Sequence, residues 1–245
     1  RVWNQPKHPV NVNLSACAVA SYDAFSAHGG TRQTSCADTK LFEIRSALAK
    51  AKNASQSATV VVVGCNKGVD AAELYSLFDY RSSASHDMPN QWRAMANTQS
   101  TDKGACGQLA IHRNYRTQHV AHAPPLAVHC IEPMPANYEL LRHTRNAVDL
   151  NHTMFRLHNT AVSGSNFPTS VYFPDGKPGA EVYGISQRPG AVLVKRVSLD
   201  SLLFDAGTVD VLQVDTEGHD PSVLFGAPRL LQRTNYLEFE IHRDL

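Results

Sequence analysis

The stretch Val60–Phe78, VVVVGCNKGVDAAELYSLF, joins four valines to a segment of helical periodicity through a turn that contains two glycines. A continuous β-branched run is typical of a strand that is covered on both faces, as in a parallel sheet. After the turn, Ala71, Leu74, Tyr75 and Phe78 recur at the spacing of one helix face. The stretch therefore predicts a strand, a tight turn and a helix of an α/β protein.

Strands and helices alternate along the rest of the chain. Further strands are expected at Leu126–Ile131, Phe155–Val162, Val209–Val214 and Tyr236–Ile241. Three helices are expected. The first carries Met134, Tyr138 and Leu141 as one apolar stripe, the second runs from an N-cap at Asp220 to Gly226, and the third begins at Pro228. This alternation predicts a doubly wound, mostly parallel sheet with helices on both faces.

Three segments lack the alternation. Residues 1–57 form an N-terminal extension, with a helix expected over about residues 39–52 behind Asp38. Residues 58–245 form the α/β domain, and residues 81–125 are an insertion that we interpret as loop with short helices. Residues 163–190 are rich in glycine, proline and serine, which predicts a long loop or a hairpin.

The charge and hydropathy of the chain narrow the class of partner. Its 245 residues carry a formal net charge of +1, which gives no electrostatic reason to expect a nucleic acid or an anionic membrane as the main partner. No apolar run reaches the length of a membrane span. The chain does not begin with methionine, so a longer or processed precursor is compatible with the sequence.

Five cysteines leave at least one thiol without an intramolecular partner. We expect Cys65, in the glycine turn, to stay reduced, whereas Cys17 could pair with Cys36 and Cys106 with Cys130. Three sequons would permit N-glycosylation in a secretory lumen, at Asn13, Asn53 and Asn151. These features leave both the cytoplasm and that lumen open.

Polar features are expected at one edge of the sheet, because ligands of doubly wound sheets lie beyond the carboxyl ends of the strands. Gly64 and Gly68 stand where the first strand meets its helix, in a pattern that is neither the P-loop nor G-x-G-x-x-G. Glu132 ends the next strand and can accept hydrogen bonds from both hydroxyls of a ribose. Asp215 and Glu217 follow a further strand. Together these features predict a site for a nucleoside-containing cofactor.

The sequence at these points resembles the FkbM family of S-adenosylmethionine-dependent methyltransferases. The matching stretches are, in order, VVVVGCNKG, IEPMPANYELL, HNTAVSG, VSLDSLL, VDVLQVDTEGHDPSVLFGAPRLL and YLEFEIH. They run from about Val60 to the C-terminus and leave the N-terminal extension uncovered. The resemblance implies a class I, Rossmann-like methyltransferase fold and methyl transfer to a hydroxyl oxygen of a sugar or a small natural product.

The resemblance also implies roles for single residues. The amino-acid end of S-adenosyl-L-methionine would be held by the turn residues Gly64, Cys65, Asn66, Lys67 and Gly68. Glu132 would hold the ribose, and the segment from Asn159 to Val162, which includes Ala161, would border the adenine. Asp215 would lie near the methionine moiety or the acceptor.

The sequence departs from the family pattern in three places. Val62 replaces a frequent aspartate before the turn, and His219 and Asp220 replace an Ala-Glu pair. The chain also stops just after the Tyr236–Ile241 strand, so we expect a C-terminal truncation or a missing edge hairpin.

Methyl transfer needs a base that removes the proton of the aligned acceptor hydroxyl. The candidates are Asp215 and His219, with Glu217 beside them, and the chemistry requires no metal. A zinc site is an alternative for residues in and after the insertion, although no C-x-x-C pair is present. Its possible ligands are Cys106, His112, His119, His122, His129 and Cys130.

Three other functions use related folds. A nicotinamide-dependent oxidoreductase is disfavoured by the missing G-x-G-x-x-G pattern, and a degenerate binding module by the retained glycines and acids. A nucleic-acid methyltransferase is disfavoured by the nearly neutral charge. The expected partner is therefore a small-molecule or glycan acceptor, whose identity the sequence does not give.

Overall fold

The structure is a computed structural model, and it describes residues 57–78, 88–100, 125–164, 169–180 and 191–239. All of these residues lie within one unit of the chain, Leu48–Leu245. The helix expected over about residues 39–52 and the Cys17–Cys36 pair fall outside the described residues.

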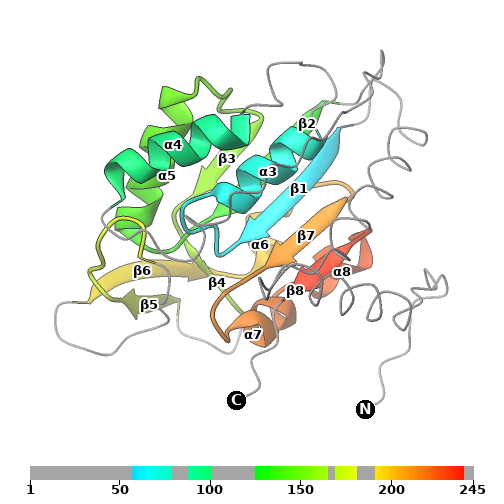
Figure 1. Cartoon of the computed structure of the whole chain (residues 1–245). Helices are drawn as coiled ribbons and strands as arrows, with labels where there is room; N and C mark the ends of the chain where they lie inside the picture. The colour runs from blue at the N-terminus through cyan, green and yellow to red at the C-terminus, as the bar shows by residue number, and fades with distance from the viewer. Residues whose placement is uncertain (1–56, 79–87, 101–124, 165–168, 181–190, 240–245) are drawn as a thin grey trace, which may run out of the picture. The chain divides into compact units, whose positions relative to one another are not determined.

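Within the part of the chain that the structure describes, five parallel strands form the main sheet (Figure 1). In spatial order they are β3 (Phe155–His158), β2 (Leu126–Ile131), β1 (Ala58–Val63), β7 (Val211–Val214) and β8 (Leu237–Phe239). The chain moves outward from β1 through β2 to β3, and later returns to the other side of β1 with β7 and β8. The strand order therefore reverses beside β1, as in doubly wound folds.

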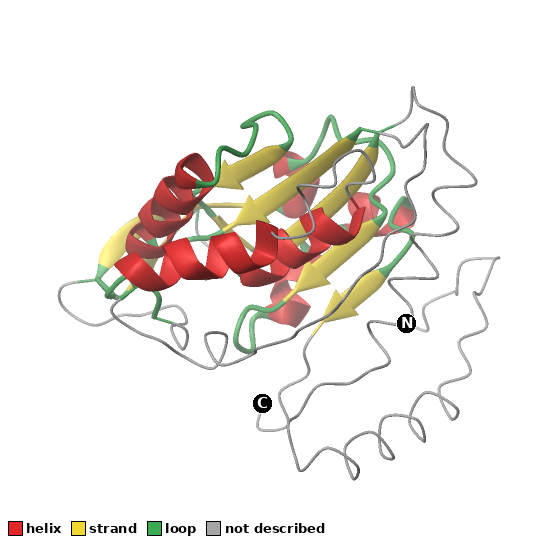
Figure 2. Cartoon of the chain, turned by 45° about the horizontal axis from the view of Figure 1, so that its top comes forward, coloured by secondary structure: helices red, strands yellow, loops and turns green. Residues whose placement is uncertain are grey.

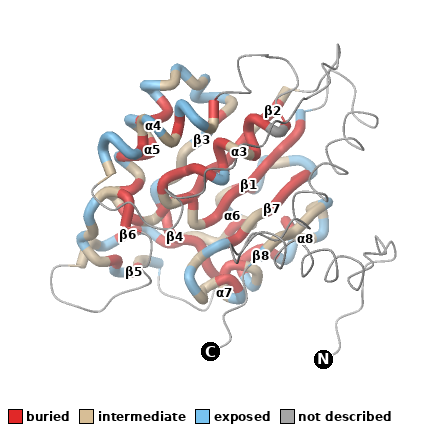
Figure 3. The backbone as a smooth tube through the Cα atoms, viewed as in Figure 1, coloured by how far each residue is buried: buried red, intermediate tan, exposed pale blue. Residues whose placement is uncertain are grey.

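β1 lies in the middle of the sheet and is buried along its full length (Figure 3). Successive side chains of a strand point to opposite faces, so a strand covered on both faces favours apolar residues throughout. Val63, the last residue of β1, is in register with Ile131 of β2 and with Val214 of β7. The carboxyl ends of these three strands therefore lie side by side.

Helices cover both faces of the sheet (Figure 2), which confirms the predicted architecture. α3 (Val69–Phe78), α4 (Met88–Gln99) and α5 (Pro135–Ala147) lie on one face, and the predicted stripe of α3 is buried. α6 (Leu199–Leu202), α7 (Asp220–Phe225) and α8 (Pro228–Gln232) contribute to one apolar cluster with β1 and β7 on the other face. Among the described helices, none has the length and apolar character that a bilayer crossing needs.

A second, three-stranded sheet departs from the prediction. It consists of β4 (Ala161–Val162), β6 (Val192–Val197) and β5 (Ser170–Phe173), with β6 in the centre. The single strand expected over Phe155–Val162 is wrong, because the chain leaves the main sheet after His158 and joins β6 at Ala161. β5 lies in the segment predicted as loop or hairpin and pairs antiparallel with β6, a strand that was not predicted.

Two helix predictions also need correction. The segment interpreted as loop with short helices contains α4, which has 12 residues. Asp220 is the first residue of α7 rather than its N-cap, a position that His219 occupies, whereas Gly226 does end the helix. α8 begins at Pro228 as predicted.

Candidate functional site

A cavity of about 320 Å³ opens at the carboxyl edge of the main sheet. Its walls come from the turn after β1, the segment after β2, the region of β4, and the turn after β7. The small sheet closes one side with Val171, Phe173 and Arg196. The cavity therefore lies where the strand order reverses, which is the usual ligand site of such sheets, and its volume suits a small molecule.

The turn after β1 is held by main-chain contacts. The N–H groups of Gly64 and Cys65 both donate to the carbonyl oxygen of Ile131, at 3.0 and 3.1 Å. Gly64 has a φ of 83° and Asn66 a φ of 49°, so both residues adopt left-handed backbone. A Cβ on Gly64 would lie 1.7 Å from the carbonyl oxygen of Asp215. Gly64 is thus required because the turns after β1 and β7 approach each other closely.

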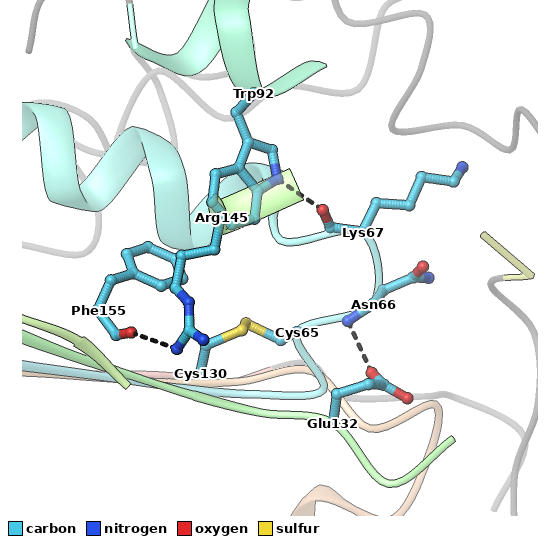
Figure 4. The surroundings of a disulfide bond; sticks show 8 residues. All are labelled: Cys65, Asn66, Lys67, Trp92, Cys130, Glu132, Arg145 and Phe155. Carbon is cyan, nitrogen blue, oxygen red and sulfur yellow. Dashed lines mark hydrogen bonds between the residues drawn. A yellow bond between two sulfur atoms is a disulfide. The ribbon is translucent and has the colours of Figure 1, made fainter. Parts of the chain in front are cut away.

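Gly68 closes the same turn against side chains of α4 and α5. Its φ is 77°, and a Cβ there would lie 2.5 Å from Cδ2 of Leu141 and 2.7 Å from Cζ2 of Trp92. Trp92 also donates from Nε1 to the carbonyl oxygen of Lys67 at 2.7 Å (Figure 4). Neither Trp92 nor Leu141 lines the cavity, whereas Lys67 does. Gly68 therefore permits packing of the turn against protein.

Glu132 is a buried carboxylate in the cavity wall. Its Oε2 accepts from the N–H of Asn66 at 2.7 Å (Figure 4), and its Oε1 accepts from the N–H of Met134 at 2.9 Å. Burial raises the pKa of Glu132 to about 7, while hydrogen bonds from Met134, Asn66 and Asn137 counteract the rise. Each carboxylate oxygen can accept a further hydrogen bond, so the geometry suits the two hydroxyls of a ribose.

Asn137, in the first turn of α5, is a site residue that sequence reasoning missed. It is 1% exposed and lines the cavity. Its Oδ1 accepts from the N–H of Gly179 at 2.8 Å, and its Nδ2 donates to the carbonyl oxygen of Ala180 at 3.0 Å. One side chain thus joins the start of α5 to the segment that follows β5. The available signal was a polar residue at a helix position that should face the protein interior.

The turn after β7 brings the predicted acids and histidine to the cavity. Asp215, Glu217 and His219 all line it, and both acids are exposed. A backbone hydrogen bond of 2.9 Å joins Asp215 to the last residue of β1. Asp220 is fully buried, and its Oδ2 accepts from the N–H and Oγ1 of Thr216, at 3.2 and 2.8 Å. Asp220 therefore holds the turn that presents the other three side chains.

The segment after β3 reaches the cavity only in part. Of the residues that the resemblance places beside the adenine, Ala161 and Val162 line the cavity, but Asn159 does not. Asn159 is exposed, and its Nδ2 donates to the carbonyl oxygens of Glu132 and Pro133, at 3.1 and 3.2 Å. The structure therefore places Asn159 behind the segment that carries Glu132.

Arg196 of β6 is a second cavity residue that was not predicted. It is 9% exposed, and its Nη1 donates to the carbonyl oxygens of Ser163 and Gly164. Among the described residues, two cations and four acids line the cavity: Lys67, Arg196, Asp70, Glu132, Asp215 and Glu217. The walls are therefore more acidic than basic.

Cys65 and Cys130 form a disulfide beside the glycine turn (Figure 4). The prediction that Cys65 stays reduced is wrong, and so is the pairing of Cys106 with Cys130. Cys65 follows β1 and Cys130 lies near the end of β2, and pairing of these strands brings the two Cα atoms to 5.6 Å. Sequence spacing does not show this proximity, because 65 positions separate the two cysteines.

The zinc alternative loses two of its possible ligands. Cys130 is in the disulfide, and His129 is buried against His158, with Nδ1 and Nε2 3.0 Å apart. The other four candidate ligands lie outside the described residues. Within the described ranges, no three histidine, cysteine or acidic side chains gather in a way that could hold a metal ion.

Comparison with known families decides the identity of the domain. The family model described as Methyltransferase FkbM domain matches residues 104–245, which is more than half of the 245-residue chain. The chain belongs to this family. The match includes Glu132, Asn137 and the turn after β7, and the glycine turn joins them through β1 of the same sheet.

This FkbM-family protein has the mostly parallel, Rossmann-like sheet that the sequence predicts, and the family assignment supports a methyltransferase. No curated protein and no solved structure matches the chain.

Proposed function

We propose that this protein transfers the methyl group of S-adenosyl-L-methionine to a hydroxyl oxygen of a sugar or another small polyhydroxylated compound. The observation that carries the proposal is the fixed, buried carboxylate of Glu132, which lies in one cavity with Asp215 and His219. Such a cavity can hold a nucleoside at one end and present a base to an acceptor at the other.

Three features of the walls fit the cofactor. Glu132 offers two oxygens to the ribose hydroxyls. Oδ1 of Asn66 is buried and accepts no hydrogen bond within the described structure. The ammonium group at the amino-acid end of the cofactor would donate a hydrogen bond to this oxygen. Apolar side chains suit the faces of a heterocycle, and five residues of one apolar cluster line the cavity: Met134, Ala161, Val171, Phe173 and Ala180.

The cofactor would supply a methyl group on a sulfonium sulfur, and the carbon–sulfur bond would break as the acceptor oxygen bonds to that carbon. The chain has to align the acceptor hydroxyl and remove its proton. We assign His219 as the base, because it lines the cavity and an imidazole nitrogen can accept the proton of an acceptor hydroxyl. Asp215 and Glu217 would then orient the acceptor, and their charges favour a neutral compound over an anionic one.

Calorimetric titration with S-adenosylhomocysteine tests the cofactor site. We expect saturable binding by the wild-type chain and at least about tenfold weaker binding by Glu132→Gln. The glutamine amide would place its own N–H group against the backbone N–H of Asn66 or of Met134, where the carboxylate accepts both hydrogen bonds. Glu139→Gln on the exposed surface of α5 is the matched control and should bind as wild type. Gly64→Val is unsuitable as a probe, because its Cβ would displace the turn after β7.

The same titration separates the alternatives. Absence of binding by the folded chain, or equal binding by Glu132→Gln, would contradict the proposal, and preferential binding of a nicotinamide cofactor would support an oxidoreductase.

The acceptor step is tested by comparing methyl transfer to neutral sugars with methyl transfer to anionic sugars. His219→Gln should lower kcat with little change in cofactor affinity, whereas an unchanged kcat would exclude His219 as the base.

A further inference from the structure

Asn151 lies in an exposed turn between α5 and β3, and it begins one of the three sequons, Asn-His-Thr. All three residues of this sequon are exposed. The turn precedes β3, whereas the cavity lies beyond the carboxyl ends of the strands. A group attached to Asn151 would therefore project from the edge of the sheet that is opposite to the cavity.

The local geometry fixes the carboxamide oxygen of Asn151 and leaves its nitrogen accessible. Oδ1 accepts hydrogen bonds from the N–H of Thr153 at 2.8 Å and from Oγ1 of Thr153 at 2.7 Å. No described residue accepts a hydrogen bond from Nδ2 of Asn151. Two donors on Oδ1 stabilise the negative charge that develops there when the amide nitrogen loses a proton. The hydroxyl of the sequon is thus placed where it can activate the nitrogen.

An independent observation concerns the compartment. Cys65 and Cys130 form a disulfide and are 5% and 0% exposed. Disulfides form and persist in oxidising compartments such as the lumen of the secretory pathway, where N-glycosylation also takes place. The disulfide and the sequon lie in different parts of the fold, so neither observation depends on the other.

We propose that Asn151 carries an N-linked glycan, attached in the oxidising lumen in which the disulfide forms. The co-substrate is an oligosaccharide joined through a diphosphate to a lipid. A bond forms between Nδ2 of Asn151 and the anomeric carbon, and the bond between that carbon and the diphosphate oxygen breaks. The diphosphate leaves with the electron pair, the amide nitrogen gives up one proton to the transferring enzyme, and no oxidation or reduction takes place.

Glycopeptide mass spectrometry tests the proposal. The 245-residue chain is directed into the secretory pathway of a eukaryotic host by a cleavable leader, together with a reporter glycoprotein. Enzymatic removal of N-glycans in heavy-oxygen water should convert Asn151 to labelled aspartate in most molecules. Thr153→Ser, which keeps a hydroxyl, should preserve this occupancy, and Thr153→Ala should reduce it to background. Mapping by peptide separates Asn151 from the other two sequons.

Occupancy is measured on total cell protein, so poor secretion of a variant does not hide the modification. An unmodified Asn151 beside a modified reporter would overturn the proposal, and so would equal occupancy in Thr153→Ala and wild type. Alkylation without reductant should leave Cys65 and Cys130 unlabelled in the glycosylated molecules. Labelling of both cysteines there would contradict the link between the glycan and an oxidising lumen. None of these outcomes depends on methyl transfer.

Discussion

Gly68 is confined by two side chains that belong to different helices. A Cβ at this position meets Leu141 and Trp92 at 2.5 and 2.7 Å, and the φ of 77° is unfavourable for any residue with a Cβ. We expect Gly68→Ala to lower the free energy of unfolding by about 3 kcal/mol, from backbone strain together with overpacking. Gly207→Ala is the control, because no described residue other than its chain neighbours lies within 4 Å of its added Cβ.

Urea denaturation followed by circular dichroism measures both variants. A change within about 0.5 kcal/mol is expected for Gly207→Ala, as for most surface substitutions. If Gly68→Ala were equally mild, the close packing of the turn against α4 and α5 would be wrong.

Asn137 links the pKa of Glu132 to the position of the cavity wall. Its hydrogen bond lowers the pKa of Glu132, so Asn137→Ala should raise that pKa further. If the ionised carboxylate accepts the ribose hydroxyls, binding weakens as pH falls through this pKa. The pH at which S-adenosylhomocysteine affinity falls should therefore move upward in Asn137→Ala. Calorimetric titrations between pH 6 and 9 measure the shift.

The control for Asn137 is a second buried polar residue of the same helix. Thr144 is 0% exposed, and its hydroxyl has no hydrogen-bond partner in the described structure. Thr144→Val should leave both the affinity and its pH dependence unchanged. An unshifted pH profile in Asn137→Ala, despite weaker binding, would mean that Asn137 only supports the wall.

Single residues of the site were predictable where their role is local. The left-handed turn at Gly64 and Gly68 follows from the strand-to-helix transition, and Glu132 follows from its place at the end of a strand. Their neighbours were not predictable, because Asp215 and Trp92 come from distant parts of the chain. Asn137 was missed for the same reason, since its partners lie more than 40 positions away.

Among the helices and strands, those with a wide apolar face were predicted and those with a narrow one were not. β1 and β7 have one polar residue each, Thr59 and Gln213, and are otherwise apolar, whereas α4 buries only Met88, Trp92 and Ala96, a single row of its surface. β6 alternates buried and exposed positions and includes Lys195 and Arg196. Its neighbour β5 lies in a segment of turn-forming residues, so sequence periodicity carried little signal there.

The disulfide connects the turn after β1 to β2. Because 65 positions separate its cysteines, closing this loop should stabilise the fold by about 4 kcal/mol through the entropy of the unfolded chain. We expect dithiothreitol to lower the free energy of unfolding by about this amount. It should also weaken S-adenosylhomocysteine binding, because the turn that carries Asn66 becomes less restrained against Glu132.

The double variant Cys65→Ala/Cys130→Ala serves as the control for this prediction. It retains the other three cysteines, so any effect of the reductant elsewhere persists in it. Its stability should match that of the reduced wild type and should not change with dithiothreitol. If dithiothreitol destabilised both proteins equally, the effect would come from a bond other than Cys65–Cys130.

At the level of the complete domain, the order of strands explains why the position of the cavity could be predicted from sequence more readily than its shape. Parallel strands deliver their carboxyl ends to one edge, so Gly64, Glu132 and Asp215 had to converge. The depth and closure of the cavity depend instead on the small β4–β6–β5 sheet, which encloses it from one side. A strand that pairs outside the main sheet has no consistent signature in the chain, so the closure was not predictable.

The domain also contains a buried histidine, His129, stacked on the partly buried His158, and this histidine predicts how the stability of the domain depends on pH. Burial, followed by the nearby His158 and Arg156, lowers the pKa of His129 to about 3, from an ordinary value of 6.5. Between these values the unfolded chain binds a proton that the folded chain excludes, so folding stability falls as pH falls below 6.5. At pH 5 the loss from His129 is about 2 kcal/mol relative to neutral pH.

His129→Leu should remove this loss, because the leucine keeps the strand position apolar and cannot take up a proton. Urea denaturation at pH 7.5 and pH 5 gives the decrease in unfolding free energy for each protein, and the decrease should be smaller by about 2 kcal/mol in His129→Leu. Glu132, whose raised pKa acts in the opposite direction between about 4.5 and 7, is present in both proteins and cancels in the comparison. His143→Gln, at an exposed site on α5, should behave as wild type. An equal decrease in His129→Leu and wild type would show that His129 is protonated in the folded domain at pH 5, and therefore accessible to water there.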